Sequence, residues 1–200
     1  MRHPRQDPPP LVTSPEHVRV FVPTRGQVRV NLIVRLDEIK EANPALPPIR
    51  YEVGTDIISG RNGIVHRFLA DPLARVLVMI DDDVEPHINL LDGLALLDEH
   101  GVVGFPYPLH AGPSFKALPD GGYEWVGTGC IAVHRDVLEA LGGCPFRYAG
   151  ASHHDVGRIG ISHTDPSEDV AFCWDARAAG FTVGVAHDLP AHHFIPSWRG

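Results

Sequence analysis

The chain has 200 residues, of which 44% are hydrophobic and 21% are charged. This length suits one domain with a sizeable core, and the composition excludes an intrinsically disordered chain. A formal net charge of −8 disfavours a protein that binds nucleic acid through a broadly basic face. We therefore expect a single folded domain of the α/β class.

The cysteines and the N-terminus indicate a reducing compartment. There are 3 cysteines, without metal-binding spacing, and an odd number does not make a disulfide framework. The N-terminus lacks the apolar core of a signal peptide, and no apolar run approaches the roughly 18 residues of a membrane span. We expect a cytoplasmic protein with a flexible, proline-rich tail at 1–16 and a folded domain at 17–200.

The first half of the chain alternates strands with helices. Strands are predicted at 18–22, 50–53 and 75–80. Helical periodicity covers 28–42 and starts again at about Arg61, in a helix that Pro72 must end. The third strand is apolar on both faces, as strands of a covered parallel sheet are.

The second half continues this alternation with an interruption. A helix at 87–101 and a strand at 102–105 are followed by a glycine- and proline-rich stretch. Residues 118–125 of this stretch predict a hairpin or an irregular excursion. A strand at 125–134, a helix at 135–143, a long loop at 142–166, a helix that starts after Ser167 and a strand at 182–185 complete the chain. This order predicts a mostly parallel central sheet flanked by helices.

Three consecutive aspartates, Asp81 to Asp83, follow the third strand. Ligands of open α/β sheets bind outside the carboxyl ends of the strands, and three adjacent carboxylates call for a cation. Alternate residues point the same way, so Asp81 and Asp83 can share a target. Alternatively, the acids begin the next helix, where the helix dipole stabilises them and Pro86 suits the first turn. The triplet alone leaves both interpretations open.

Further motifs follow in order along the chain. They are "PTRG" from Pro23, "RN" at Arg61, "DDD" from Asp81, "GTGC" from Gly127 with "RDVL" from Arg135, and "EDVAFC" from Glu168 followed by Gly180-Phe181 and the pair His192-His193. Between Val18 and Phe194 the chain resembles the family 2-like glycosyltransferases of the GT-A fold, which use nucleotide-sugar donors. The resemblance implies one Rossmann-like GT-A domain and sugar transfer to an acceptor hydroxyl, with inversion.

The resemblance also implies a metal site. A divalent ion, Mn²⁺ or Mg²⁺, neutralises the departing phosphate and is held by few protein ligands together with the substrate phosphates. The similarity makes Asp83 the direct ligand and places Asp81 nearer the ribose or the metal's waters. His193 completes the shell, although a shift of one residue would favour His192.

By the same resemblance, Glu168 and Asp169 carry the catalytic role, with Asp169 as the general base that takes the proton of the acceptor hydroxyl. Acids in the first turn also stabilise any helix, by about 0.3–1 kcal/mol each. This purely structural interpretation remains open for both residues.

Donor and acceptor residues follow from the matched motifs. The expected donor-binding residues are Pro23, Thr24, Arg25, Arg61, Asn62, Asp81 and Asp82. Arg61 and Asn62 are expected at a helix start, where N–H groups and a guanidinium hold a diphosphate. The expected acceptor or sugar-binding residues are Trp125, Gly127, Thr128 and Gly129. The donor is expected to be a UDP- or GDP-sugar, and the acceptor is left open.

Two other function classes compete with the transferase. A metal-dependent phosphohydrolase also uses acids after a strand together with histidines. A non-catalytic nucleotide-sugar or glycan-binding module would keep the fold without turnover. The acceptor platform must come from loops 106–124 and 142–166, from a partner, or from a second copy of the chain in a homo-oligomer.

Overall fold

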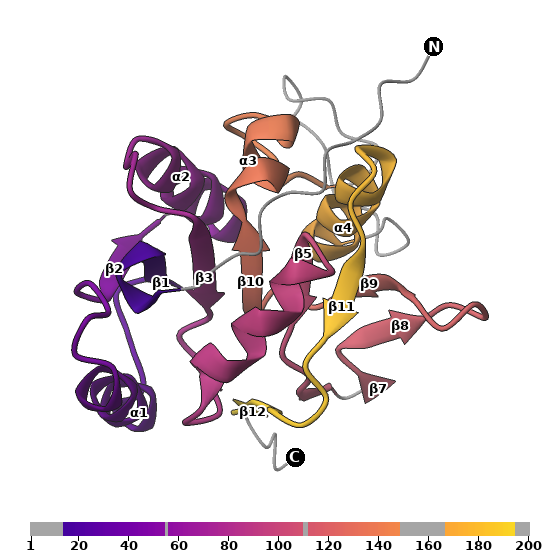
Figure 1. Ribbon diagram of the computed structural model, residues 1–200. Helices are drawn as coiled ribbons and strands as arrows, with labels where there is room; N and C mark the ends of the chain where they lie inside the picture. The colour runs from indigo at the N-terminus through magenta and orange to yellow at the C-terminus, as the bar shows by residue number, and fades with distance from the viewer. Residues whose placement is uncertain (1–13, 55, 110–111, 149–166, 195–200) are drawn as a thin grey trace.

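A six-stranded sheet forms the centre of the protein, in the order β11-β5-β10-β3-β1-β2 (Figure 1). The computed structural model describes residues 14–54, 56–109, 112–148 and 167–194. The strands are β1 (Val18–Thr24), β2 (Arg50–Val53), β3 (Val76–Ile80), β5 (Val102–Gly104), β10 (Cys130–His134) and β11 (Val183–Val185). β1 pairs in parallel with β2 and β3, and β11 pairs in parallel with β5. The predicted mostly parallel α/β sheet is confirmed.

Helices cover both faces of this sheet. They are α1 (Val30–Ala42), α2 (Ile57–Leu69), α3 (Arg135–Leu141), α4 (Glu168–Ala178) and the 3₁₀ helices η1 (Pro15–His17) and η2 (Leu90–Asp98). Val76, Val78 and Ile80 of β3 pack in a core with the leucines of α1 and η2. Leu77 and Met79 pack in a second core with α2, α3 and α4. The two-residue period of a strand thus separates two cores and makes a three-layer structure.

Three small antiparallel sheets lie beside the large one. β4 (Val84–Glu85) pairs with β12 (His192–His193), β6 (Pro108–Leu109) with β7 (Gly112–Pro113), and β8 (Phe115–Ala117) with β9 (Tyr123–Val126). The β8–β9 pair is the predicted hairpin. The β4–β12 pair joins the end of the described chain to the segment that follows the aspartates.

Beyond shifts of one or two residues at the ends of several elements, four features differ from the expectation. The strand expected at 125–134 is two strands, because Gly127–Gly129 carries the chain from the hairpin into the central sheet. β10 then runs antiparallel between β3 and β5. The helix expected at 87–101 is the shorter 3₁₀ helix η2. Within η2, Gly93 packs against the ring of Phe105, and a Cβ at this position would lie only 2.6 Å from a ring carbon. α2 begins at Ile57 rather than Arg61, since Asp56 caps it by accepting the Ser59 N–H.

The fourth difference concerns the aspartates. The chain forms β4 directly after Asp83, and η2 begins only at Leu90. The alternative in which the acids begin the next helix is therefore wrong.

Two arginines, Arg19 and Arg135, make hydrogen bonds that hold together the segments at the amino end of the sheet. Arg19, at the start of β1, donates from Nε to Asp71 Oδ2 at 2.7 Å and from Nη1 to the Glu16 and Val18 carbonyls. Arg135, at the start of α3, donates to the carbonyls of Leu69, Asp71 and Ala74. These bonds tie the segment that enters β3 to its neighbours.

Within the described part of the chain, each helix is too short or too polar to cross a lipid bilayer. Residues 1–13 of the expected proline-rich tail and residues 149–166 of the expected loop lie outside the described residues, whereas Pro15 and Glu16 form η1 together with His17.

Candidate functional site

The three aspartates lie at the carboxyl end of β3 and face an open pocket. The Asp81 N–H donates to the Gly129 carbonyl at 2.8 Å, and the Val84 N–H donates to the Asp81 carbonyl at 3.0 Å. These bonds turn the chain sharply at the sheet edge. The pocket has a volume of about 420 Å³ and is lined by Pro23, Thr24, Arg25, Gly54, Asp56, Ile57, Gly60, Asp81, Asp82 and Asp83. Five of the residues expected to bind the donor thus share one pocket.

A second hollow adjoins this pocket. It has a volume of about 570 Å³ and is lined by Arg25, Gln27, Val28, Arg29, Asp82 and Asp83. The Thr24 hydroxyl donates to the Gln27 carbonyl at 3.0 Å and accepts the Gly26 N–H at 3.1 Å. Gly26 has a φ of 96°, a left-handed conformation that favours glycine. Thr24 and Gly26 therefore shape the turn that presents Arg25 beside the acids.

Asp83 and His193 come together at the same edge. The register of β4 and β12 places His193 opposite Val84 and His192 opposite Glu85, and the Phe194 N–H donates to the Asp83 carbonyl at 2.9 Å. His193 Nε2 lies 3.4 Å from Asp83 Oδ2, whereas the exposed His192 ring packs against Phe194. Of the two histidines weighed as ligands, the fold thus brings His193 to the acids.

This pair has the chemistry of a metal site. A carboxylate oxygen and an imidazole nitrogen suit Mn²⁺, and hard divalent cations often take few protein ligands beside substrate phosphates. Among the described residues, no group of three or more histidine, cysteine, aspartate or glutamate side chains is arranged to hold a metal. The pair of Asp83 and His193 fits a divalent ion that takes its remaining ligands from substrate phosphates.

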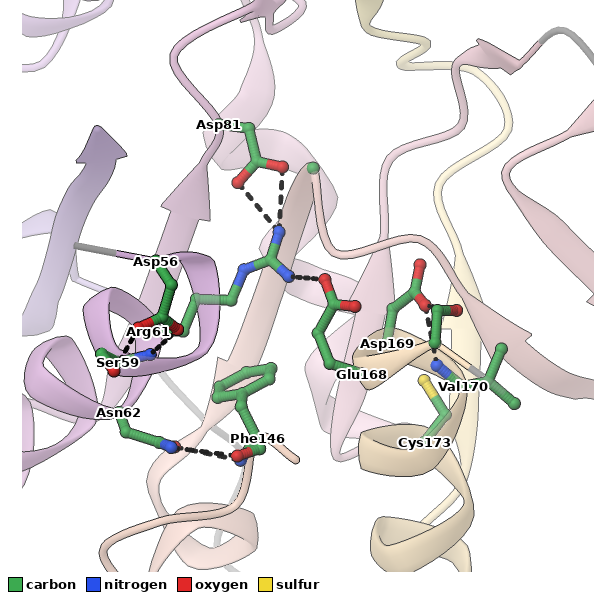
Figure 2. Close-up of polar contacts among 12 residues, drawn as sticks. Asp56, Ser59, Arg61, Asn62, Asp81, Phe146, Glu168, Asp169, Val170 and Cys173 are labelled. Carbon is green, nitrogen blue, oxygen red and sulfur yellow. Dashed lines mark hydrogen bonds and ion pairs between the residues drawn. The ribbon is translucent and has the colours of Figure 1, made fainter. Parts of the chain in front are cut away.

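Arg61 links the acids of β3 to the start of α4. Its side chain is only 2% exposed. Its Nη2 lies 2.9 Å from both Asp81 carboxylate oxygens, and its Nη1 lies 2.5 Å from Glu168 Oε1 (Figure 2). Since α2 begins at Ile57, Arg61 lies in its second turn, and the expectation of a helix-start position for Arg61 and Asn62 is wrong. Neither residue lines the two hollows.

Asn62 binds protein main chain. Its amide nitrogen donates to the Phe146 carbonyl at 2.9 Å, and its amide oxygen accepts the Phe146 N–H at 3.0 Å. The Phe146 ring stacks on Phe172 of α4 with 4.6 Å between centroids. Asn62 thus secures the segment on which α4 packs.

The cluster of Arg61, Asp81 and Glu168 has more negative than positive charge. Burial raises the pKa of Asp81 above its ordinary value, against the opposing effect of Arg61. Burial alone would lower the pKa of Arg61, but the charges of Asp81 and Glu168 outweigh it and the pKa is raised. One buried guanidinium therefore faces two carboxylates.

The start of α4 holds both predicted catalytic acids. Figure 2 shows Glu168 turned toward Arg61 and Asp169 on the far side of Glu168 from it. The Ser167 hydroxyl donates to Asp169 Oδ1, which also lies 3.0 Å from the Val170 nitrogen. Ser167 occupies the N-cap position, as predicted, but its side chain makes no cap hydrogen bond to the helix. Both carboxylates are half-buried.

The predicted acceptor residues lie near the acids but outside the two hollows. Gly127, Thr128 and Gly129 connect β9 to β10, and Gly129 contacts Asp81 through the main chain. Thr128 is buried, and the half-buried Trp125 pairs with Lys116 in the β8–β9 hairpin.

Tyr107 is the residue that sequence reasoning missed. Its hydroxyl accepts the Gly129 N–H at 3.0 Å, and a Cβ on Gly127 or Gly129 would lie 2.5 Å from that oxygen. Its ring packs edge-on against His193, with 5.4 Å between centroids. Burial, then the Asp81 charge, raises the pKa of Tyr107. The two glycines thus make room for Tyr107. The sequence could have indicated this residue, because it follows the strand β5 closely and therefore lies at the same edge of the sheet as the aspartates.

The chain matches no protein-family model and no curated protein. Solved structures share its fold. A197 from STIV is 23% identical with a TM-score of 0.61, over 90% of this chain and 86% of that one. A 4-diphosphocytidyl-2C-methyl-D-erythritol synthase from Anaerococcus prevotii is 10% identical with a TM-score of 0.52, over 86% of this chain and 87% of that one.

A third structure is that of GalNAc-T7 with UDP, GalNAc and Mn²⁺. It is 12% identical with a TM-score of 0.53, over 88% of this chain and 38% of that one. Together these likenesses show a GT-A-like α/β fold.

Proposed function

We propose that the protein is a divalent-metal-dependent glycosyltransferase, which moves a sugar from a nucleoside-diphosphate sugar to an acceptor hydroxyl with inversion. The observation that carries the proposal is the contact of His193 with Asp83, one of the acids that line a pocket at the ends of β1 and β3. The fold shared with GalNAc-T7, whose structure contains UDP and Mn²⁺, supports it.

Asp83 and His193 would hold Mn²⁺ or Mg²⁺, and the ion would supply positive charge to the departing diphosphate. The other pocket residues bind and orient the donor. Pro23, Thr24, Arg25, Asp81 and Asp82 line the pocket together. On this proposal they would contact the nucleoside part of the donor. The Arg29 N–H contacts the Asp82 carbonyl at 3.4 Å, which holds the loop after β1 against the acids.

Asp169 would serve as the general base. Its carboxylate accepts the proton of the acceptor hydroxyl while that oxygen bonds to the anomeric carbon and the bond from this carbon to the diphosphate oxygen breaks. A hydrogen bond donated by the Ser167 hydroxyl orients the Asp169 carboxylate. Trp125 and the Gly127–Gly129 segment, next to Asp81, would line the acceptor side.

Calorimetric titration with UDP and GDP, with and without Mn²⁺, tests the donor site. We expect Mn²⁺-dependent binding of one of them. Ligand at 100 times its Kd would raise the free energy of unfolding by about 2.7 kcal/mol, a shift visible in thermal unfolding. If neither UDP nor GDP binds, the proposal is overturned.

A screen of nucleotide sugars then separates the function classes. Release of nucleoside diphosphate with transfer of the sugar supports the transferase, and the anomeric configuration of the product tests inversion. Cleavage of the donor between its phosphates would indicate a phosphohydrolase. Release of pyrophosphate from a nucleoside triphosphate would indicate a nucleotidyltransferase. Binding without turnover of any donor would indicate a binding module.

The two adjacent histidines provide a matched pair of variants. We expect His193→Ala to abolish the Mn²⁺ dependence of nucleotide binding, because it removes the nitrogen that faces Asp83. His192→Ala removes an exposed ring one residue away and should bind as the wild type does. The reverse result would assign the ligand to His192.

A further inference from the structure

Arg61 joins three parts of the site that are distant in the sequence. It lies on α2, binds Asp81 20 residues further on, and binds Glu168 107 residues further on. No other arginine–carboxylate contact among the described residues joins β3 to α4. The side chain that the motif assigned to the donor diphosphate is thus bound on two sides by protein.

The surroundings of Arg61 leave little of its guanidinium for a ligand. Both Nη atoms are bound to carboxylates. Its Nε has no hydrogen-bond partner among the described residues, but it is buried and therefore not open to a ligand in the pocket. The carbon at its centre lies 5.8 Å from the centroid of the Phe146 ring, which itself stacks on Phe172 of α4. Arg61 therefore packs over the Phe146 ring, which Asn62 and α4 hold in place.

We propose that Arg61 is a positioning residue of the transferase and not a ligand of the donor. It fixes the Asp81 carboxylate beside Asp83, and through Glu168 it fixes the first turn of α4, which carries Asp169. On this assignment Glu168 is also a positioning residue, and Asp169 alone contacts the acceptor hydroxyl. The inference rests on the proposed function for its catalytic consequence, but the geometric link exists without it.

The residue type suits this role. A guanidinium is planar and donates from two nitrogens at once, so it can hold two carboxylates at a set separation. A lysine keeps the charge but offers one nitrogen on a flexible stem, and cannot reproduce both contacts. Glu168→Gln keeps an oxygen that accepts from Nη1 while removing the charge.

Kinetics of Arg61→Lys and Glu168→Gln, with Arg147→Lys as control, test the proposal. Arg147 also makes a two-oxygen contact with an acid of α4, Asp175, at 2.7 Å, but it lies outside both hollows. We expect both test variants to lower kcat by about 10- to 100-fold, as loss of supporting contacts does. In Glu168→Gln, which leaves the contact between Arg61 and Asp81 in place, the donor KM and the metal-free affinity for UDP or GDP should stay within about twofold. The control should retain its kcat.

A diphosphate ligand would behave differently. If Arg61 contacts the donor phosphates, Arg61→Lys raises the Kd of the nucleoside diphosphate in the absence of metal while the affinity for the bare nucleoside is unchanged. That result would overturn the proposal. So would an unchanged kcat in both test variants.

Hydrogen exchange without any ligand separates this inference from the proposed function. The Ala171 N–H donates to the Ser167 carbonyl at 3.0 Å and closes the first turn of α4. We expect peptides over 168–173 to exchange at least about tenfold faster in Arg61→Lys and Glu168→Gln than in Arg147→Lys. Equal exchange in all three would overturn the link, even where nucleotide binding has been shown. Faster exchange in a protein that binds no nucleotide would support the link while the proposed function fails.

Discussion

The two ends of the central sheet use the same residue types in opposite ways. At the amino end, Arg19 and Arg135 meet Asp71 and main-chain carbonyls, and the hydrogen bond from Arg19 lowers the pKa of Asp71. At the carboxyl end, Arg61 faces both Asp81 and Glu168, and burial raises the pKa of Asp81. The amino end thus uses charge to stabilise the fold, while the carboxyl end retains excess negative charge where a cation and a diphosphate are proposed to bind.

The largest expected effect comes from the proposed base at the carboxyl end. Asp169→Asn removes the proton acceptor and should lower kcat by about 10²- to 10⁴-fold. Donor binding should remain at the wild-type value, and the free energy of unfolding should fall by no more than about 1 kcal/mol, the contribution of a first-turn acid to its helix. The amide keeps the size of the side chain and can still accept the hydrogen bond of the Ser167 hydroxyl. Transfer assays with titration of UDP or GDP measure both quantities. Near-normal transfer would remove Asp169 as the base.

Asp83→Asn should abolish metal-dependent donor binding with the fold intact. A bound cation supplies several kcal/mol to the transition state, so kcat/KM should fall by more than about 100-fold. Asp83 makes no contact with Arg61, and its side chain is 44% exposed, so stability should change little. Unchanged Mn²⁺-dependent binding in this variant would exclude the ligand role.

The amino end should show the reverse pattern. Asp71→Asn leaves the buried Arg19 guanidinium without its carboxylate and should lower the free energy of unfolding by about 1–2 kcal/mol. Transfer and donor binding should remain normal, because Asp71 is at the opposite end of β3 from the pocket. Urea unfolding beside activity assays tests this. An equal loss of stability in Asp83→Asn would erase the contrast between the two ends.

The pH dependence follows from the same contact. Since the pKa of Asp71 is lower in the folded than in the unfolded protein, its contribution is complete above the ordinary aspartate pKa of about 4. It is lost as the pH falls from there through the folded pKa. The difference in unfolding free energy between wild type and Asp71→Asn should therefore shrink on acidification. A difference that stays constant below about pH 4 would exclude ionised Asp71 as its source.

Much of the fold could be predicted because its signals are local. The apolar run before Asp81 marked a central strand, and the alternation of strands and helices marked a mostly parallel sheet. The antiparallel course of β10 could not be foreseen, since an apolar strand looks the same whichever way its neighbours run.

The candidate site divides in the same way, into residues with a local signal in the sequence and residues that only the tertiary structure brings together. Asp83 lies at a strand end, which a sequence shows. The bond from Arg61 to Glu168 spans 107 residues, and nothing in the local pattern of either residue indicates the other. The place of Tyr107 under Gly127 and Gly129 likewise depends on tertiary packing.

Asp81→Asn should change stability less than Asp71→Asn does, and it tests the charge imbalance at the carboxyl end most directly. The variant leaves Arg61 with Glu168 alone, one cation to one carboxylate, while the amide oxygen still accepts from Nη2. Because the folded pKa of Asp81 is raised, the ionised carboxylate opposes folding. This cost is absent below the ordinary aspartate pKa of about 4, grows as the pH rises from there through the folded pKa, and is complete above it. We expect the free energy of unfolding at neutral pH to rise by up to about 1 kcal/mol, with weakened donor binding. The gain should vanish in acid, and urea unfolding at both pH values measures it. A loss of stability as large as that of Asp71→Asn would mean that the pair of Arg61 and Asp81 stabilises the fold just as the pair of Arg19 and Asp71 does.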